Sequence, residues 1–139
     1  MANCISIRNL CKTFTTNKSL KIKALRDIEL DIKENDFICI VGPSGCGKST
    51  LLRIIAGLET ATDGKIIYKD SELKDSTREI GMVFQNYSLL QWRTVLDNIA
   101  LGLEFKGESK KKRLEVAEEY LELIGMDDFG KAYPYELSG

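Results

Sequence analysis

The stretch FICIVGPSGCGKST, residues 37–50, decides the fold of this chain. Residues 37–41 form an apolar run rich in β-branched side chains, which is typical of a strand covered on both faces. A glycine-rich segment follows, and residues 48–56 then carry an apolar helical pattern that reaches Gly57, where a helix would end. The stretch therefore predicts a buried strand, a loop and a helix in direct succession.

Residues 42–49 of this stretch match the pattern G-x-x-x-x-G-K-[ST]. Glycines let the backbone turn tightly and aim successive N–H groups into one concavity, and the positive end of the helix dipole faces the same place. Lys48 would place a charge on the β- and γ-phosphates, and the hydroxyl of Ser49 would bind Mg²⁺. The pattern predicts a site for ATP and Mg²⁺. The alternative is a glycine-rich turn that matches by accident, in about half a percent of chains of this length.

The rest of the chain predicts strands and helices around this unit. Alternating apolar and polar residues predict antiparallel strands, with a turn at Glu34 and Asn35, and a helical apolar pattern predicts an amphipathic helix from Ser109, its N-cap, to Ile124. The predicted strands besides residues 37–41 are residues 5–10, 28–32, 65–68 and 80–84. The fold class predicted is α/β with an N-terminal antiparallel β subdomain.

Composition excludes several classes of protein. The 139 residues include 20 basic and 21 acidic side chains, so the net charge of -1 gives no positive field that would favour nucleic acid. No run approaches the roughly 20 apolar residues of a membrane-spanning helix, and a cytosolic chain is expected. The four cysteines lack metal-ligand spacing and there is no histidine. Reduced thiols are expected.

Several motifs together resemble the ABC ATPases. Residues 40–53 look like their Walker A region, residues 80–85 with residues 89–92 look like their Q-loop, and residues 135–139 look like the start of their LSGG signature. Phe14 stands where the family carries an aromatic residue that stacks on adenine. The resemblance implies a P-loop NTPase of the ABC ATPase type, in which residues 1–139 are the N-terminal part of an ABC ATP-binding domain, truncated within the signature.

The resemblance also implies roles for single residues. Gln85 would sense the γ-phosphate through Mg²⁺ or the attacking water, and Ser49 and Gln85 would be the metal ligands. Ser138 and Gly139 would contact ATP held by a second copy. Without the resemblance, Phe14 would be interpreted as a core residue and Gln85 as a solvated strand end. The nucleotide contacts implied are Phe14, Gly42, Pro43, Ser44, Gly45, Cys46, Gly47, Lys48, Ser49 and Thr50.

Residues 90–104 are similar to the corresponding segment of nitrate, sulfonate and taurine importers. The function implied is that of an ATP-binding subunit that energises the import of such a small anion. Its partners would be a transmembrane permease subunit and a second ATP-binding subunit in a head-to-tail dimer, with no nucleic acid, at the cytoplasmic face of the cell membrane. Two alternatives stay open: a soluble ABC ATPase acting on nucleic acid or ribosomes, and a non-catalytic truncated remnant.

Other features favour plainer interpretations. The Mg²⁺-orienting aspartate, the catalytic glutamate and the switch histidine of the family would follow Gly139, so no catalytic residue is expected in this chain beyond Gln85 as a sensor. Residues 110–113 are basic, but glutamates later in the same predicted helix cancel their charge, which favours a solvated helix face. Cys46 is expected to be a small filler and not a nucleophile, because no neighbouring base is present.

Overall fold

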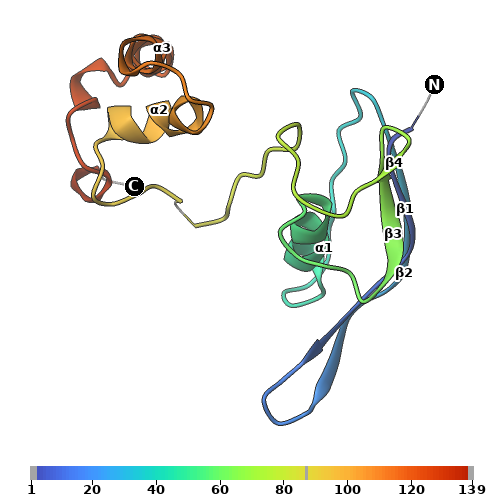
Figure 1. The fold of residues 1–139 in the computed structure, drawn as a ribbon. Coiled ribbons are helices and arrows are strands. Elements are labelled where there is room, and N and C mark those ends of the chain that lie inside the picture. Colours follow the sequence, from blue (N-terminus) through green and yellow to red (C-terminus); the bar gives the residue numbers. More distant parts are fainter. Residues whose placement is uncertain (1–2, 87, 138–139) are drawn as a thin grey trace. The chain divides into compact units, whose positions relative to one another are not determined.

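The computed structural model describes residues 3–86 and 88–137. The chain folds as two compact units, Met1–Val83 and Phe84–Gly139. Figure 1 shows a sheet with one helix in the first unit, and helices in the second.

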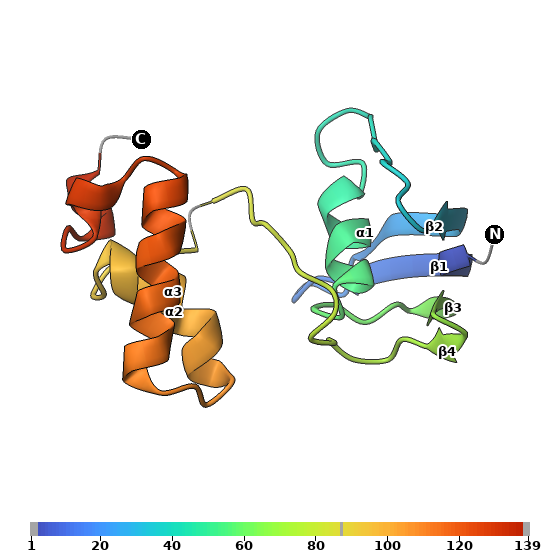
Figure 2. The same cartoon turned by 90° about the horizontal axis from the view of Figure 1, so that it is seen from above.

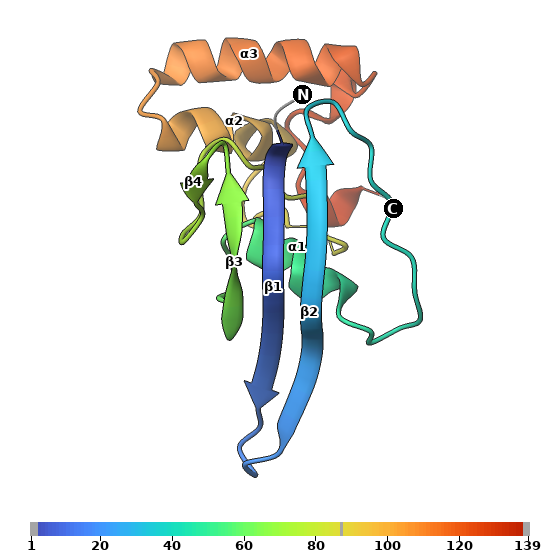
Figure 3. The same ribbon diagram turned by 90° about the vertical axis from the view of Figure 1, so that its right-hand side faces the viewer.

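The first unit is built on an antiparallel sheet with the strand order β2-β1-β3-β4 (Figure 3). Its strands are β1 (Asn3–Thr15), β2 (Lys21–Lys33), β3 (Asp63–Tyr68) and β4 (Ser71–Glu72). Strand β3 pairs with β1 only as far as Cys11, whereas β2 follows β1 to its end. The far part of the β1–β2 hairpin therefore projects beyond β3. The three strands predicted at residues 5–10, 28–32 and 65–68 are confirmed.

Helix α1 (Lys48–Ile55) covers one face of this sheet, as Figure 2 shows. The core between them consists of buried aliphatic side chains, each worth about 1.5 to 3 kcal/mol on burial. These side chains are Ile7, Leu10, Leu25, Leu51, Ile54 and Ile66. The helix ends as predicted, because Gly57 takes a φ of +68° and Leu58 N–H donates to the carbonyl of Arg53 at 2.8 Å.

The strands predicted at residues 37–41 and 80–84 are wrong for this structure. Both segments are irregular, and Phe37, Val41 and Val83 are 95%, 86% and 97% exposed. A β-branched run suits a pleated surface, but a strand is stabilised only by neighbours that complete its ladder. Among the residues described, no segment pairs with either run, and the expected cover on both faces is also absent there.

The second unit packs α2 (Val95–Phe105) against α3 (Lys110–Leu123), with short 3₁₀ helices at Asp127–Phe129 and Pro134–Glu136. The contact buries small and aliphatic side chains, among them Ala100, Ala117 and Leu121. The predicted helix starting after Ser109 is confirmed, because the Ser109 hydroxyl accepts a hydrogen bond from Lys112 N–H. Within the described part of the chain, no helix is long and apolar enough to cross a membrane.

Helix α2 is an element beyond those predicted from the sequence above. Its apolar residues do recur at helical spacing, at Val95, Leu96, Ile99, Ala100 and Leu103. Its start also carries a cap: the Thr94 side chain accepts a hydrogen bond from Asp97 N–H at 3.2 Å, and its hydroxyl donates to the Asp97 carboxylate at 3.0 Å. The sequence Thr-x-x-Asp marks this helix start, in the manner of a capping box.

Candidate phosphate site

Two left-handed glycines shape the loop between residues 42 and 48. Gly45 and Gly47 take φ values of +76° and +96°, a region that other residues adopt only with strain. Gly47 is the N-cap of α1 and has no side chain with which to cap it. The N–H groups of the first helical turn are therefore open to an outside acceptor, which is the arrangement that binds anions.

The loop is held closely against strand β2. A Cβ atom on Gly47 would lie 2.5 Å from the carbonyl oxygen of Ala24 and 2.9 Å from Cδ2 of Leu25, so only glycine fits. Inside the loop, a Cβ on Gly42 would lie 2.9 Å from Sγ of Cys46. Side chains at positions 42 and 47 would therefore obstruct the path of this segment.

Lys48 lies over the same loop. Its Nζ donates to the carbonyl oxygens of Gly42 at 2.8 Å and Pro43 at 2.7 Å, and lies 3.6 Å from Sγ of Cys46. The structure therefore brings a lysine ammonium, two left-handed glycines and a helix N-terminus together. A ligand phosphate at this place would meet both the charge and the backbone N–H groups.

The remaining loop residues line the same short path. Pro43, Ser44 and Cys46 are exposed, as is Ser49 in the first turn of α1, whereas Thr50 is half-buried. An exposed hydroxyl beside the lysine fits Mg²⁺, which takes oxygen ligands and is commonly shared between a protein and nucleotide phosphates. All four cysteines are free.

Phe14 lies in the projecting part of the hairpin, opposite Ile22. Its ring is 38% exposed, and Nζ of Lys12 stands 4.8 Å from the ring centroid. The same ammonium donates to Glu59 and to the carbonyl of Thr60, both at 2.6 Å, and the bond to Glu59 holds the pKa of that carboxyl below its usual value. A partly open, oriented ring is suited to stacking, and the adenine role of Phe14 stays a prediction.

Three predicted site residues lie apart from this loop in the chain. Gln85 is exposed and belongs to the second unit. Ser138 and Gly139 fall outside the described residues. Their roles as γ-phosphate sensor and as contacts across a dimer remain predictions.

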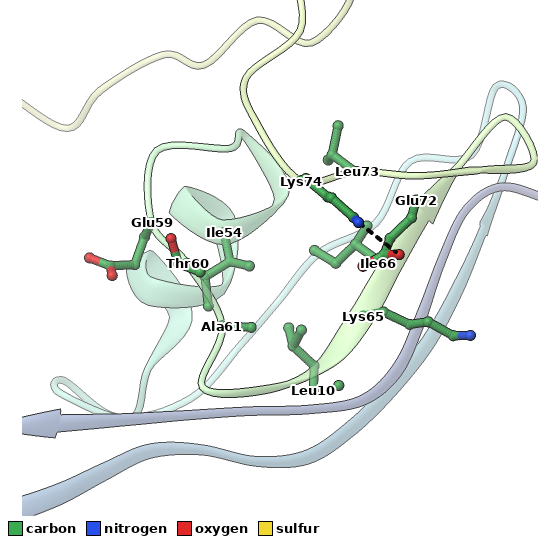
Figure 4. A pocket seen from close by; sticks show the side chains of 11 residues that line it. Leu10, Ile54, Glu59, Thr60, Ala61, Lys65, Ile66, Glu72, Leu73 and Lys74 are labelled. Atoms are coloured by element: carbon green, nitrogen blue, oxygen red, sulfur yellow. Dashed lines mark ion pairs between the residues drawn. The ribbon is translucent and has the colours of Figure 1, made fainter.

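A hollow of about 280 Å³ opens elsewhere in the first unit, between α1 and the sheet. Figure 4 shows its wall of core side chains, including Leu10, Ile54 and Ile66, with the Glu72–Lys74 ion pair at the rim. None of the residues 42–49 lines it. The hollow is an edge of the apolar core and is separate from the phosphate site.

Comparison with protein families gives one match that spans most of the chain. Residues 25–139 match the family described as ABC transporter. The chain belongs to the ABC transporter family.

Relatives of this ABC chain agree with that membership. An uncharacterized ABC transporter ATP-binding protein of Methanocaldococcus jannaschii is 47% identical over 135 residues, covering 97% of this chain and 50% of the relative. A nitrate import ATP-binding protein of Synechocystis is 43% identical over 135 residues, with the same coverage of each. The chain thus spans about half the length of these curated relatives.

A solved structure confirms the ABC fold. An ATP-binding cassette in a dimeric post-hydrolysis state, bound to ADP and Pi, superposes with a TM-score of 0.84 at 33% identity, covering 96% of this chain and 63% of that one. The predicted fold class, a P-loop NTPase of the ABC ATPase type with an antiparallel β subdomain, is therefore confirmed.

Proposed function

We propose that this chain is the ATP-binding part of an ABC importer for a small anion such as nitrate, sulfonate or taurine. One observation carries the proposal: the left-handed glycines of residues 42–48 lead into α1 with the Lys48 ammonium held over the loop. Family membership and a relative named for nitrate import support the transport role.

In this proposal the loop binds the triphosphate of ATP. Backbone N–H groups of the loop and the first turn of α1 would donate hydrogen bonds to the β-phosphate, and Lys48 would leave the carbonyls of Gly42 and Pro43 to neutralise the β- and γ-phosphates. Ser49 would hold Mg²⁺, with Gln85 as a second ligand. Bound ATP supplies the phosphoryl group, and the chain's own residues position and neutralise it.

The partners proposed are a permease and a second ATP-binding subunit. Leu89 and Trp92 are exposed beside half-buried Leu90, which gives an apolar surface for a helix of a transmembrane subunit. The second copy would meet Ser138 and Gly139 head to tail. The complex would then sit at the cytoplasmic face of the membrane, with this chain peripheral to it.

Titration with Mg-ATP and co-purification with a permease test the proposal together. Calorimetry should show saturable Mg-ATP binding, and a tagged chain expressed in its native host should retain a multi-span membrane protein. ATP binding with ribosomes or nucleic acid as the retained material would favour a soluble ABC ATPase. Absence of saturable ATP binding would favour a non-catalytic remnant and would refute the proposal.

A further inference from the structure

Asn98 holds the turn that carries the exposed Trp92 side chain. Its Oδ1 accepts a hydrogen bond from Leu90 N–H at 2.8 Å. Its Nδ2 donates to the carbonyl oxygens of Leu90 at 3.1 Å, Arg93 at 3.1 Å and Thr94 at 2.9 Å. One side chain in the first turns of α2 thus binds both ends of residues 90–94.

This network uses both ends of the Asn98 amide. The carbonyl oxygen faces an N–H donor and the amino group faces carbonyl acceptors, so a flipped amide would place oxygen against oxygen. The side chain is half-buried, and a lost partner there leaves backbone groups without the bond they make in the fold. The Trp92 side chain is 74% exposed and contributes little to the buried core of the second unit.

The same end of α2 also holds the segment that leads toward the signature. Val95 N–H donates to the carbonyl of Ala132 at 2.8 Å, and Leu96 N–H donates to the carbonyl of Gly130 at 3.0 Å. Two helix N–H groups that lack intrahelical partners are satisfied in this way. The first turn of α2 therefore lies between the Trp92 turn and residues 130–132, with separate bonds to each.

We propose that Asn98 is a positioning residue that fixes the turn of residues 90–94 on α2, so that Trp92 is presented in one orientation and moves together with residues 130–132. The inference rests on the proposed function only for the identity of what docks on this turn, namely a helix of the permease. A docked helix that shifts the turn would shift α2, and α2 would carry the segment of residues 130–132.

The rival interpretation is that Asn98 merely stabilises α2. The two interpretations differ in which backbone amides lose their protection from hydrogen exchange when the hydrogen bonds of Asn98 are removed. Loss of a positioning residue frees the Leu90 amide and leaves the amides of Val95 and Leu96 protected, because their acceptors lie elsewhere. General loosening of α2 would release all three amides together.

The test uses the 139-residue chain and its single tryptophan. Asn98→Ala should speed hydrogen exchange at the Leu90 amide by about tenfold, as expected for one lost hydrogen bond near 1.4 kcal/mol, and should lower the fluorescence anisotropy of Trp92. Asn98→Asp keeps an acceptor for Leu90 N–H but loses the donors. It should also lower the Trp92 anisotropy, with a smaller change at Leu90.

Gly102→Ala supplies the matched control for helix stability. A Cβ on Gly102 in α2 meets nothing within 4 Å, so this change strengthens the helix without touching the turn. The Trp92 and Leu90 changes should persist in Asn98→Ala/Gly102→Ala. Any of three results would overturn the inference. Gly102→Ala could reverse these changes, or the Trp92 anisotropy could stay unchanged in both Asn98 variants. Hydrogen exchange could also speed up at the Leu90, Val95 and Leu96 amides together. If Asn98→Ala does not fold, the same measurements and criteria are applied to Asn98→Asp. None of these measurements needs ATP or a permease, so a failure of the proposed function would be seen separately.

Discussion

A Cβ atom on Gly47 would lie 2.5 Å from the carbonyl oxygen of Ala24, so strand β2 fixes the path of the phosphate loop by direct backbone contact. The contact joins residues far apart in sequence, and it places the N-cap of α1 against strand β2 of the antiparallel sheet. The loop is therefore shaped both by its own glycines and by a strand that contains no part of the motif.

Gly47→Ala is expected to cost about 2 to 5 kcal/mol of stability, from left-handed strain together with overpacking against Ala24. Gly45→Ala is the matched control, because Gly45 is also left-handed but a Cβ there meets nothing within 4 Å. It should cost only about 1 to 2 kcal/mol. Urea denaturation of both variants measures the difference. Equal losses in the two would mean that β2 does not constrain the loop.

Lys48→Ala should weaken Mg-ATP binding by about 1.5 to 3 kcal/mol, the value of a hydrogen bond to a charged group. Isothermal calorimetry measures this loss. Lys33→Ala, at the exposed end of β2, removes the same charge away from the loop and should leave affinity unchanged. Because Lys48 also bonds to Gly42 and Pro43, the melting temperature of each variant is compared first. Equal affinity in a folded Lys48→Ala variant would refute the phosphate role.

Local signals in the sequence predict helices α1 and α3 and three strands of the sheet. Helix α3 could be predicted because Ser109 caps it and Gly125, with a φ of +67°, ends it within the same short segment. The runs at residues 37–41 and 80–84 have equally strong strand composition, yet they form no strand. A strand depends on neighbours distant in sequence, which composition does not reveal.

The sequence likewise predicts one part of the candidate site and not another. The motif of residues 42–49 predicts a tight loop before a helix, and the structure has one. The contact of Gly47 in this loop with Ala24 joins residues that are far apart in the chain and that no short motif links. Such pairings follow from tertiary packing, so a single sequence without relatives gives no sign of them.

Phe14→Ala should weaken ATP and GTP binding together, by about 1 to 3 kcal/mol, if the ring stacks on the base. Base identity matters little for stacking, because every base presents a π face. Ile22→Ala is the control, since Ile22 is the cross-strand partner of Phe14 and its loss loosens the same hairpin without removing an aromatic ring. Fluorescent nucleotide titration compares the two. Similar losses in both variants would indicate a hairpin effect and no stacking.

Because of Glu104, the second unit should lose stability at acid pH. Arg93 donates to both of its carboxylate oxygens, at 2.8 Å and 3.2 Å, and Arg113 lies 3.3 Å away. The bonds from Arg93 hold the pKa of Glu104 below its usual value. A carboxyl group whose pKa is lower in the folded chain than in the unfolded chain stabilises the folded state at pH values above its unfolded pKa of about 4.3. This stabilisation is lost as the pH falls through the folded pKa.

Glu104→Gln should therefore be less stable than the unmodified chain at pH 7, and the gap should close below about pH 4. Urea denaturation at a series of pH values measures the gap. Glu119→Gln, on the exposed surface of α3, removes the same charge and should show a much smaller gap. A gap for Glu104→Gln that stays constant from pH 7 to pH 3 would exclude the ion pair as its cause.

The exposed runs at residues 37–41 and 80–84 predict that the purified chain associates with itself. Large apolar side chains such as Phe37 and Val83 lie open to solvent on segments with strand composition, which favours pairing between copies. We expect the purified chain to self-associate in light scattering as its concentration rises. Replacing Phe37 and Val83 by Thr should reduce this association.

The same chain is expected to bind Mg-ATP without turning it over. In the proposed function, binding would depend on the loop and Lys48, whereas hydrolysis would also require a residue that orients the attacking water, a carboxylate that the family resemblance places after Gly139. Fusing the remaining half of the Methanocaldococcus jannaschii relative, which is 47% identical over the shared part, should suppress self-association and give Mg²⁺-dependent ATPase activity. Phosphate release is the measurement, with Lys48→Ala in the fusion as the inactive control. Turnover by the unfused chain that Lys48→Ala abolishes would mean that a carboxylate already among its residues orients the water.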